Sequence, residues 1–178
     1  MISASNLNLS PDRESLAASS SSPDLQKFLR FQLGGKDTTL IAVEPIVEII
    51  PLNIREILPV PQMPSYVLGI YNWRGDMLWL SDLGHLVGFP PLFQSRASAS
   101  RAMAIVVGSE EKSMGLVVSE VTDIEAYSRA QMRPSDPQLF SDRLLPFLQG
   151  YFITDSNEIL VALEVRSLFQ VPTWRSLV

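Results

Sequence analysis

Two stretches of this chain occur twice, and the second copies keep the order of the first. Residues 31–50 (FQLGGKDTTLIAVEPIVEII) parallel residues 105–124 (IVVGSEEKSMGLVVSEVTDI), and residues 69–83 parallel residues 150–165. In both cases the second copy carries one extra residue in its turn. An internal repeat of this kind predicts two similar sets of strands. The alternative is chance similarity, because short alternating apolar patterns match one another easily.

The size of each copy limits how the two sets can be arranged. A unit of about 70 residues has a small core and is marginally stable alone. We therefore expect the two strand sets to pack together, with a shared apolar interface and a groove where they meet.

Short apolar runs separated by turn signals make up most of the chain. Hairpins are expected at 28–43, 67–80 and 150–163, and short helices at 82–87, capped by Asp82, and at 164–170. Many short strands with few helices predict an all-β fold of sandwich or barrel type. Residues 1–24 are rich in serine, which predicts a flexible tail.

The composition narrows the function classes. The chain has no cysteine, one histidine (His85), a net charge of −5 and a pI near 4.9. An acidic chain without a Lys/Arg cluster is a poor match for nucleic acid or an anionic membrane. We find no apolar run of about 20 residues and no signal peptide, so we expect a cytoplasmic protein.

No motif for catalysis is present. The sequence lacks a glycine-rich phosphate loop, a nucleophile elbow and a zinc-protease motif, and we expect no catalytic residue, no cofactor and no metal. Two alternatives stay open. One is a small β-barrel that binds a ligand, and the other is a cryptic hydrolase that uses carboxylates alone.

Two charges lie within or next to apolar strands. Glu48 lies within Ile46–Ile50, and Arg74 follows a tryptophan at a strand end. Because burying either charge alone costs several kcal/mol, we hypothesise that Glu48 and Arg74 form a bidentate bridge. The alternative is two unrelated charges on exposed strand faces. Gly75 follows Arg74 and is expected to supply a positive φ angle in the turn.

A longer stretch around this turn resembles a known family. Residues 66–83 (YVLGIYNWRGDMLWLSDL) resemble the signature of CheW-like domains, which contains the element N-[LW]-R-G. Residues 47–50 and 114–121 resemble two further strands of that family. The resemblance covers about residues 25–172, and we expect a C-terminal tail at 173–178.

The resemblance implies a fold and a mode of action. It implies two packed five-stranded β-barrels with short helices, one of them terminal. We expect subdomains at roughly 25–90 and 101–165, intertwined at their termini. It also implies a protein without enzymatic activity that couples the cytoplasmic tip of a methyl-accepting chemoreceptor to the regulatory domain of a CheA-type histidine kinase.

The resemblance also implies site residues. Family members carry a glutamate and an arginine at the positions of Glu48 and Arg74. Asn72, Arg74 and Gly75 are expected to shape the partner-binding surface, with Glu48 and Asp82 supporting it from behind.

Two tryptophans distinguish the chain from flagellar-type members. Trp73 and Trp79 stand where those members have aliphatic residues, and the W-R-G-x-M-L-W-L-x-D-L variant resembles cyanobacterial homologues that serve pilus-based motility and phototaxis. The expected output is taxis or pilus motility, in a protein recruited to membrane receptor arrays.

Overall fold

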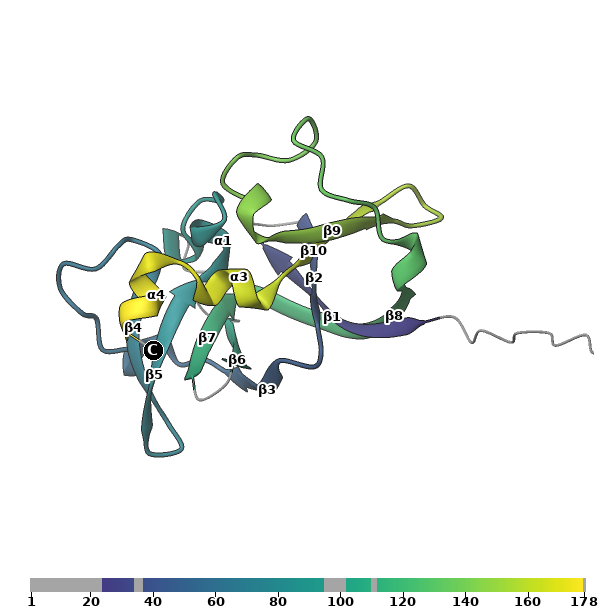
Figure 1. Ribbon diagram of the computed structural model, residues 1–178. Helices are drawn as coiled ribbons and strands as arrows, with labels where there is room; N and C mark the ends of the chain where they lie inside the picture. The colour runs from purple at the N-terminus through teal and green to yellow at the C-terminus, as the bar shows by residue number, and fades with distance from the viewer. Residues whose placement is uncertain (1–23, 34–36, 95–101, 110–111, 178) are drawn as a thin grey trace, which may run out of the picture.

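The computed structural model describes residues 24–33, 37–94, 102–109 and 112–177. They form two five-stranded sheets placed side by side (Figure 1). Sheet A has the strand order β8-β1-β2-β10-β9, and sheet B has the order β3-β6-β7-β5-β4. The strands of sheet A are β1 (Leu25–Leu33), β2 (Asp37–Ala42), β8 (Glu120–Ser128), β9 (Leu148–Ile153) and β10 (Ile159–Leu163). Those of sheet B are β3 (Ile46–Pro51), β4 (Val67–Trp73), β5 (Asp76–Asp82), β6 (Met103–Ser109) and β7 (Lys112–Val118).

Helices are short and lie between or after strands. They are α1 (Leu83–Leu86), α3 (Val165–Phe169), α4 (Pro172–Leu177) and the 3-10 turns η1 (Ile54–Glu56), η2 (Leu92–Gln94), η3 (Arg129–Gln131) and η4 (Leu145–Phe147). The two helices predicted from the sequence are confirmed as α1 and α3. No helix in the described part of the chain is long and apolar enough to cross a membrane.

The strand order shows that the repeat is real. Replacing each of β1–β5 by the strand five places later, and each of β6–β10 by the strand five places earlier, converts the order of sheet A into that of sheet B. The one parallel pair of each sheet, β2 with β10 and β7 with β5, falls at the equivalent place. The two copies therefore fold to one plan, and chance similarity does not explain them.

Local irregularities recur at equivalent positions as well. Val47 is skipped in the pairing of β3 with β6, and Thr122 is skipped in the pairing of β8 with β1. Leu68 is skipped in β4 and Gln149 in β9. A bulge bends its strand and increases its twist, so these four extra residues give both sheets the same curvature.

The sheets exchange strands between the two halves of the chain. Sheet A joins β1 and β2 of the first half to β8–β10 of the second, and sheet B joins β6 and β7 to β3–β5. The expected subdomains at 25–90 and 101–165 therefore do not coincide with the sheets. The chain crosses to the other sheet after β2 and again after β7, so the exchange reaches well beyond the termini.

Neither sheet is closed by a full ladder, but in each one the chain beyond one edge meets the opposite edge strand at a single point. Beyond β3, Leu58 exchanges two backbone hydrogen bonds with Ile70 of β4, at 2.9 and 3.0 Å. Beyond β8, Arg133 does the same with Tyr151 of β9, at 2.8 and 3.0 Å. The all-β, two-sheet prediction is confirmed, and each unit is a curved sheet to which the word barrel applies loosely.

Two glycines allow the backbones to approach closely at these two points. A Cβ atom on Gly69 would lie 2.2 Å from the carbonyl oxygen of Leu58, and one on Gly150 would lie 2.5 Å from that of Arg133. Only a residue without a side chain lets the two backbones approach this closely. Gly69 and Gly150 are equivalent in the repeat, so the second copy preserves the requirement.

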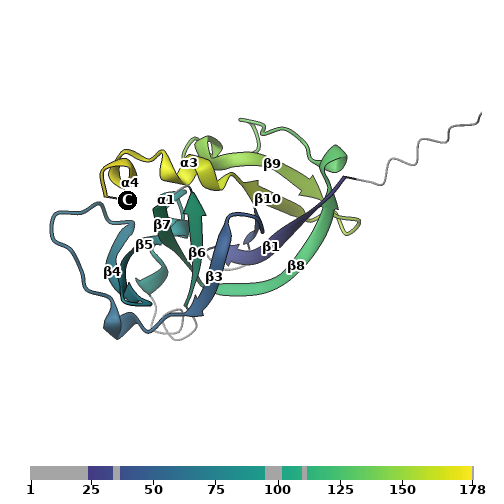
Figure 2. The same ribbon diagram turned by 60° about the horizontal axis from the view of Figure 1, so that its bottom comes forward.

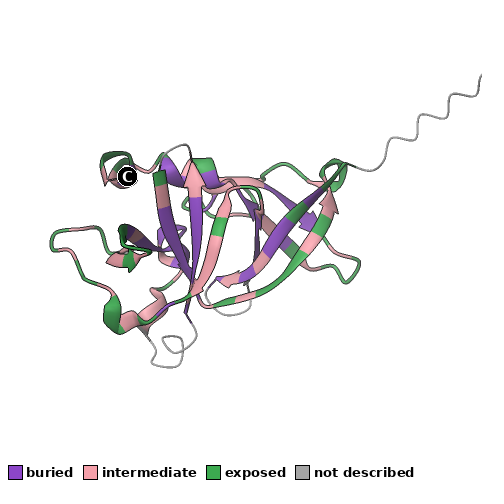
Figure 3. Cartoon of the chain, turned by 90° about the horizontal axis from the view of Figure 1, so that it is seen from below, coloured by how far each residue is buried: buried purple, intermediate pink, exposed green. Residues whose placement is uncertain are grey.

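The core has a shared part and two separate parts. The largest buried cluster takes residues from both sheets, among them Phe31 of β1 and Met114 of β7, which confirms the expected apolar interface. Smaller clusters fill the inside of sheet B and of sheet A. Figure 3 shows the inner strands largely buried, whereas β8 at the edge of sheet A is mostly exposed.

The C-terminal end packs on this core. Helix α3 lies over the junction of the sheets, and α4 continues past it towards sheet B (Figure 2). Trp174 of α4 is fully buried, and its ring packs edge-on against Tyr66 at 6.1 Å. Up to Leu177, the expected tail at 173–178 is therefore a packed helix, because one large aromatic side chain holds it to the core.

Candidate partner-binding site

The β4–β5 hairpin ends in a two-residue turn. Trp73 and Asp76 form the last pair, and Arg74 and Gly75 between them have φ angles of +57° and +93°. Two consecutive positive φ angles are typical of the type I′ turn that suits tight hairpins. The side-chain oxygen of Asn72 accepts a hydrogen bond from the Gly75 N–H at 3.1 Å and fixes the turn. The positive φ predicted for Gly75 is confirmed.

Three side chains connect this turn to the far edge of sheet B. Glu48 Oε2 accepts a hydrogen bond from Trp73 Nε1 at 2.7 Å and lies 3.0 Å from Arg74 Nη2. The Arg74 guanidinium lies 5.3 Å from the Trp73 ring centre, within cation–π range. Because β3 and β4 are the outermost strands of sheet B, these contacts join its two edges. We call Glu48, Trp73 and Arg74 the edge clip.

The edge clip confirms the pairing of Glu48 with Arg74, but the expected bidentate bridge is not formed. One guanidinium nitrogen meets one carboxylate oxygen, and the second donor is the Trp73 indole rather than another guanidinium N–H. The pair is not buried, since the side chains of Arg74 and Glu48 are 64% and 33% exposed. The hydrogen bond from Trp73, followed by the one from Arg74, lowers the pKa of Glu48 below its ordinary value.

Apolar surface lies next to the turn. Met77, on the strand that leaves the turn, is 76% exposed. A pocket of about 380 Å³ beside it is lined by residues that include Trp73, Trp79 and Lys112, and by Leu177 of α4. An exposed methionine and half-buried tryptophans beside an arginine are a composition enriched in protein interfaces.

Asp82 lies apart from this cluster, at the other end of β5. It is 2% exposed, and its Oδ1 accepts the His85 N–H at 3.0 Å while its Oδ2 accepts the Leu92 N–H at 2.7 Å. Asp82 therefore orders α1 and η2. The structure brings together Asn72, Arg74, Gly75 and Glu48, but not Asp82.

The single histidine holds two loops together. His85 Nε2 lies 2.8 Å from Ser65 Oγ, and His85 Nδ1 lies 3.0 Å from the Phe89 carbonyl oxygen. Among the residues that the structure describes, no three His, Asp or Glu side chains gather as a metal-binding group.

Sequence reasoning did not assign Trp73 or Met77 to the site. For Met77 a signal existed, because the alternation of β5 points Leu78 and Leu80 inward and hence Met77 outward. For Trp73 there was none, since only the curvature of sheet B brings its indole to Glu48.

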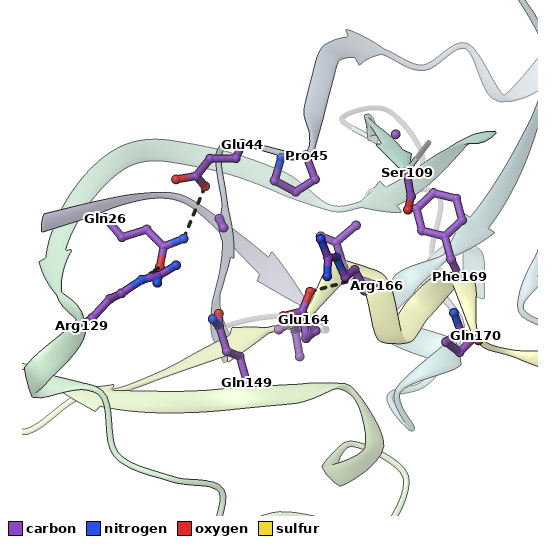
Figure 4. Close-up of a pocket in the computed structure, with 14 residues that line it drawn as sticks. Gln26, Glu44, Pro45, Ser109, Arg129, Gln149, Glu164, Arg166, Phe169 and Gln170 are labelled. Atoms are coloured by element: carbon purple, nitrogen blue, oxygen red, sulfur yellow. Dashed lines mark hydrogen bonds between the residues drawn. The ribbon is translucent and has the colours of Figure 1, made fainter. Parts of the chain in front are cut away.

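A second concave surface lies where the sheets meet (Figure 4). This inter-sheet groove has a volume of about 680 Å³. Its lining includes Gln26, Glu44, Arg129, Gln149, Glu164 and Phe169. A groove at this junction was expected from the packing of two strand sets.

Known proteins resemble this chain over most of its length. Residues 27–172 match the CheW-like domain family. A probable chemotaxis protein CheW of Rhizobium etli is 30% identical over 124 residues, which cover 66% of this chain and 76% of that protein. A chemotaxis protein CheW of Treponema pallidum is 20% identical over 143 residues, or 80% of this chain and 81% of that protein.

A solved structure has the same fold. The scaffolding protein TtCheW from Thermoanaerobacter tengcongensis superimposes with a TM-score of 0.71 at 21% identity, over 86% of this chain and 93% of that one. Together with the match over residues 27–172, this shows that the chain belongs to the CheW-like domain family.

Proposed function

We propose that the chain is a signalling adaptor without enzymatic activity. It couples the cytoplasmic tip of a methyl-accepting chemoreceptor to the regulatory domain of a CheA-type histidine kinase, in a pathway for taxis or pilus motility. Its membership of the CheW-like family and the chemotaxis names of its relatives support this proposal. A cytoplasmic location, with recruitment to membrane receptor arrays, belongs to the same proposal.

The observation that carries the proposal is an exposed turn held in a fixed shape. Asn72 fixes the backbone at Gly75, and the edge clip holds Arg74 while leaving most of its side chain exposed. A preorganised surface loses less conformational entropy on binding. We assign Asn72, Arg74 and Gly75 to the partner-binding surface and Glu48 to its support. Asp82 contributes by fixing the opposite end of β5.

Calorimetry tests this assignment. The full chain is titrated against the isolated regulatory domain of a CheA-type kinase from the same organism, and separately against a receptor-tip fragment. Arg74→Ala is expected to weaken binding of at least one partner about tenfold, as loss of an interface arginine does. The matched control is Arg55→Ala, which removes another exposed arginine outside the edge clip and both pockets.

The possible outcomes test the adaptor function and the location of its binding site separately. If the unaltered chain binds neither partner, the adaptor proposal fails. If it binds and both arginine variants bind equally well, the adaptor function stands but its site is elsewhere. Unfolding curves of both variants show whether any loss of binding reflects loss of fold.

A further inference from the structure

The contact between Ser65 and the single histidine has a defined polarity. The Phe89 carbonyl oxygen, 3.0 Å from His85 Nδ1, can only accept a hydrogen bond, so Nδ1 carries the proton of the neutral imidazole. Nε2 is then unprotonated and accepts the hydrogen bond from Ser65 Oγ at 2.8 Å. A hydroxyl that donates to a neutral imidazole, itself oriented by a third group, is the arrangement that activates a serine as a nucleophile.

The serine is held in place by contacts outside this pair. Ser65 lies on a turn that is closed by the hydrogen bond from the Val67 N–H to the Pro64 carbonyl oxygen at 2.9 Å. The carbonyl oxygen of Tyr66 accepts the Asp82 N–H at 2.8 Å, which fastens the turn to the end of β5. Because backbone groups make these contacts, the position of the turn does not depend on the Ser65 side chain.

The histidine is fixed in the same way. The His85 N–H donates to Asp82 Oδ1 at 3.0 Å, and three of the four residues of α1 are buried. The Phe89 N–H donates to the Gly84 carbonyl oxygen at 2.9 Å, which places the residue whose carbonyl group orients the ring. Base and nucleophile are thus brought together by the fold, and holding reacting groups in position is a large part of what lowers a barrier.

The serine is also accessible to a reagent. Ser65 is an exposed residue. The backbone N–H of Tyr66, the next residue, donates no hydrogen bond to the residues that the structure describes. In a nucleophile elbow, the N–H of the residue after the serine binds the oxygen of the attacked carbonyl group. The site therefore offers a base, a nucleophile and a donor for the developing oxyanion.

We propose that Ser65 is an acylation site that takes an acyl group from an activated ester or thioester. Oγ attacks the acyl carbonyl carbon, and its proton passes to His85 Nε2. The bond from this carbon to the leaving oxygen or sulfur breaks, and the leaving group departs as an anion that takes up the proton from the imidazolium. The products are an ester of Ser65 and a free alcohol or thiol.

This reaction takes place once per chain. It needs no turnover, so it is compatible with an adaptor that has no enzymatic activity and does not depend on the proposed coupling function. The ester has no proton to donate, so acylation also removes the hydrogen bond from Ser65 to His85.

The probe is p-nitrophenyl acetate, whose phenolate departs without being protonated first. The full chain is incubated with it, and mass spectrometry of digested samples locates the acetyl groups. Ser65 should be acetylated about a hundredfold faster than Ser156, an exposed serine whose Oγ lies 2.8 Å from Thr154 Oγ1 instead of a base. Hydroxylamine should remove the acetyl group from Ser65, because it cleaves esters and leaves the amides of acetylated lysines intact.

Variants identify the role of the histidine. His85→Phe keeps an aromatic ring but has no base, and should slow acetylation of Ser65 about a hundredfold. Ser65→Ala keeps the imidazole and should abolish the rapid release of p-nitrophenolate, whereas the matched control Ser156→Ala should leave it unchanged. Because His85→Phe removes contacts to two loops, the unaltered chain unfolded in urea gives a second measurement. There Ser65 and Ser156 should react at equal rates.

Three results would overturn the proposal. One is equal acetylation of Ser65 and Ser156 in the folded chain. Another is rapid release of p-nitrophenolate that persists in Ser65→Ala, which would assign the reaction to the imidazole itself. The third is a preference for Ser65 that survives in His85→Phe or in urea, since the reactivity would then not come from the folded pair. Melting temperatures show whether Ser65→Ala and His85→Phe keep the fold.

Discussion

Sheets A and B have the same strand order but differ in the charged and aromatic side chains that link their strands. In sheet B, Glu48 of one edge holds Trp73 and Arg74 of the other. In sheet A, Arg30 of β1 lies between two carboxylates, with Nη1 3.1 Å from Glu125 of β8 and Nη2 2.9 Å from Glu158, just before β10. The cation of sheet A is thus enclosed by two carboxylates, whereas that of sheet B reaches outward from one.

The aromatic contacts also differ between the two sheets. Tyr127 of β8 stacks on Phe152 of β9 at 4.7 Å, and its hydroxyl donates a hydrogen bond to Glu125. In sheet A the rings thus hold β8 against β9, and the charges of Arg30, Glu125 and Glu158 pair with one another. Sheet B joins its edges with fewer groups and leaves Arg74 and Met77 available, which is why we assign partner binding to its hairpin.

The largest expected effect on stability comes from the two glycines at which the backbones approach most closely, one in each sheet. Gly150→Ala should destabilise the protein by about 1–3 kcal/mol through overpacking against Arg133. Gly69→Ala should cost a further 1–3 kcal/mol or so, because Gly69 also has a φ of +136°, which other residues adopt with strain. Urea unfolding of both variants measures the difference.

Gly75→Ala is the control for those glycines. Gly75 has a positive φ of +93°, but a Cβ atom there would meet nothing within 4 Å. It should therefore show the conformational cost without the steric one. If Gly69→Ala were no more destabilising than Gly75→Ala, the close approach at Leu58 would not matter for stability.

The second-largest expected effect is a difference in stability between variants of Arg30 and of Arg74. Arg30→Met leaves Glu125 and Glu158 facing each other without their shared partner, and should cost on the order of 1–2 kcal/mol in these partly exposed surroundings. Arg74→Met should change the free energy of unfolding little, since Arg74 is largely exposed. Equal losses in chemical denaturation would contradict the idea that only sheet A depends on its cation.

Alkaline pH should affect sheet A. Burial, and then the hydrogen bond to Glu125, raises the pKa of Tyr127 from 10.0 to about 12. Because the folded state holds the phenol proton more tightly, this contribution is fully present below pH 10 and is lost as pH rises towards 12. Stability measured across this range should fall, and Tyr127→Phe should remove part of the fall. An identical decline in the variant would rule out Tyr127 as its cause.

Acid should affect sheet B, with a smaller effect. The pKa of Glu48 lies below its ordinary value of 4.5, so its contribution is present above pH 4.5 and is lost as pH falls through the lower, folded-state pKa. The stability difference between the unaltered chain and Glu48→Gln should therefore shrink in acid. The Trp73 indole N–H resonance should move over the same pH range, and a resonance that stays constant would mean that the edge clip does not depend on this charge.

Several local features of the site could be predicted from the sequence. The turn chemistry of Gly75 and the cap at Asp82 follow from residue types and spacing, because each depends on a local preference. The pairing of Glu48 with Arg74 was predicted from the cost of burying a charge, but the structure leaves both side chains partly exposed, so that argument named the right partners for a reason that does not apply. Intertwining of the two subdomains was predicted at their termini alone, and the wider exchange of strands after β2 and β7 was not, since these strands carry no local signal for where the chain goes next. Trp174 was assigned to a tail because it lies beyond residue 172, where the family resemblance ends.

The most direct test compares equivalent positions on the two hairpins. Met77 and Ile159 occupy matching places after their turns and are 76% and 43% exposed. Calorimetric titration with the kinase regulatory domain should show that Met77→Ser weakens binding about tenfold, while Ile159→Ser stays within about twofold of the unaltered chain. Equal weakening, or weakening by Ile159→Ser alone, would contradict the assignment of recognition to the hairpin of sheet B.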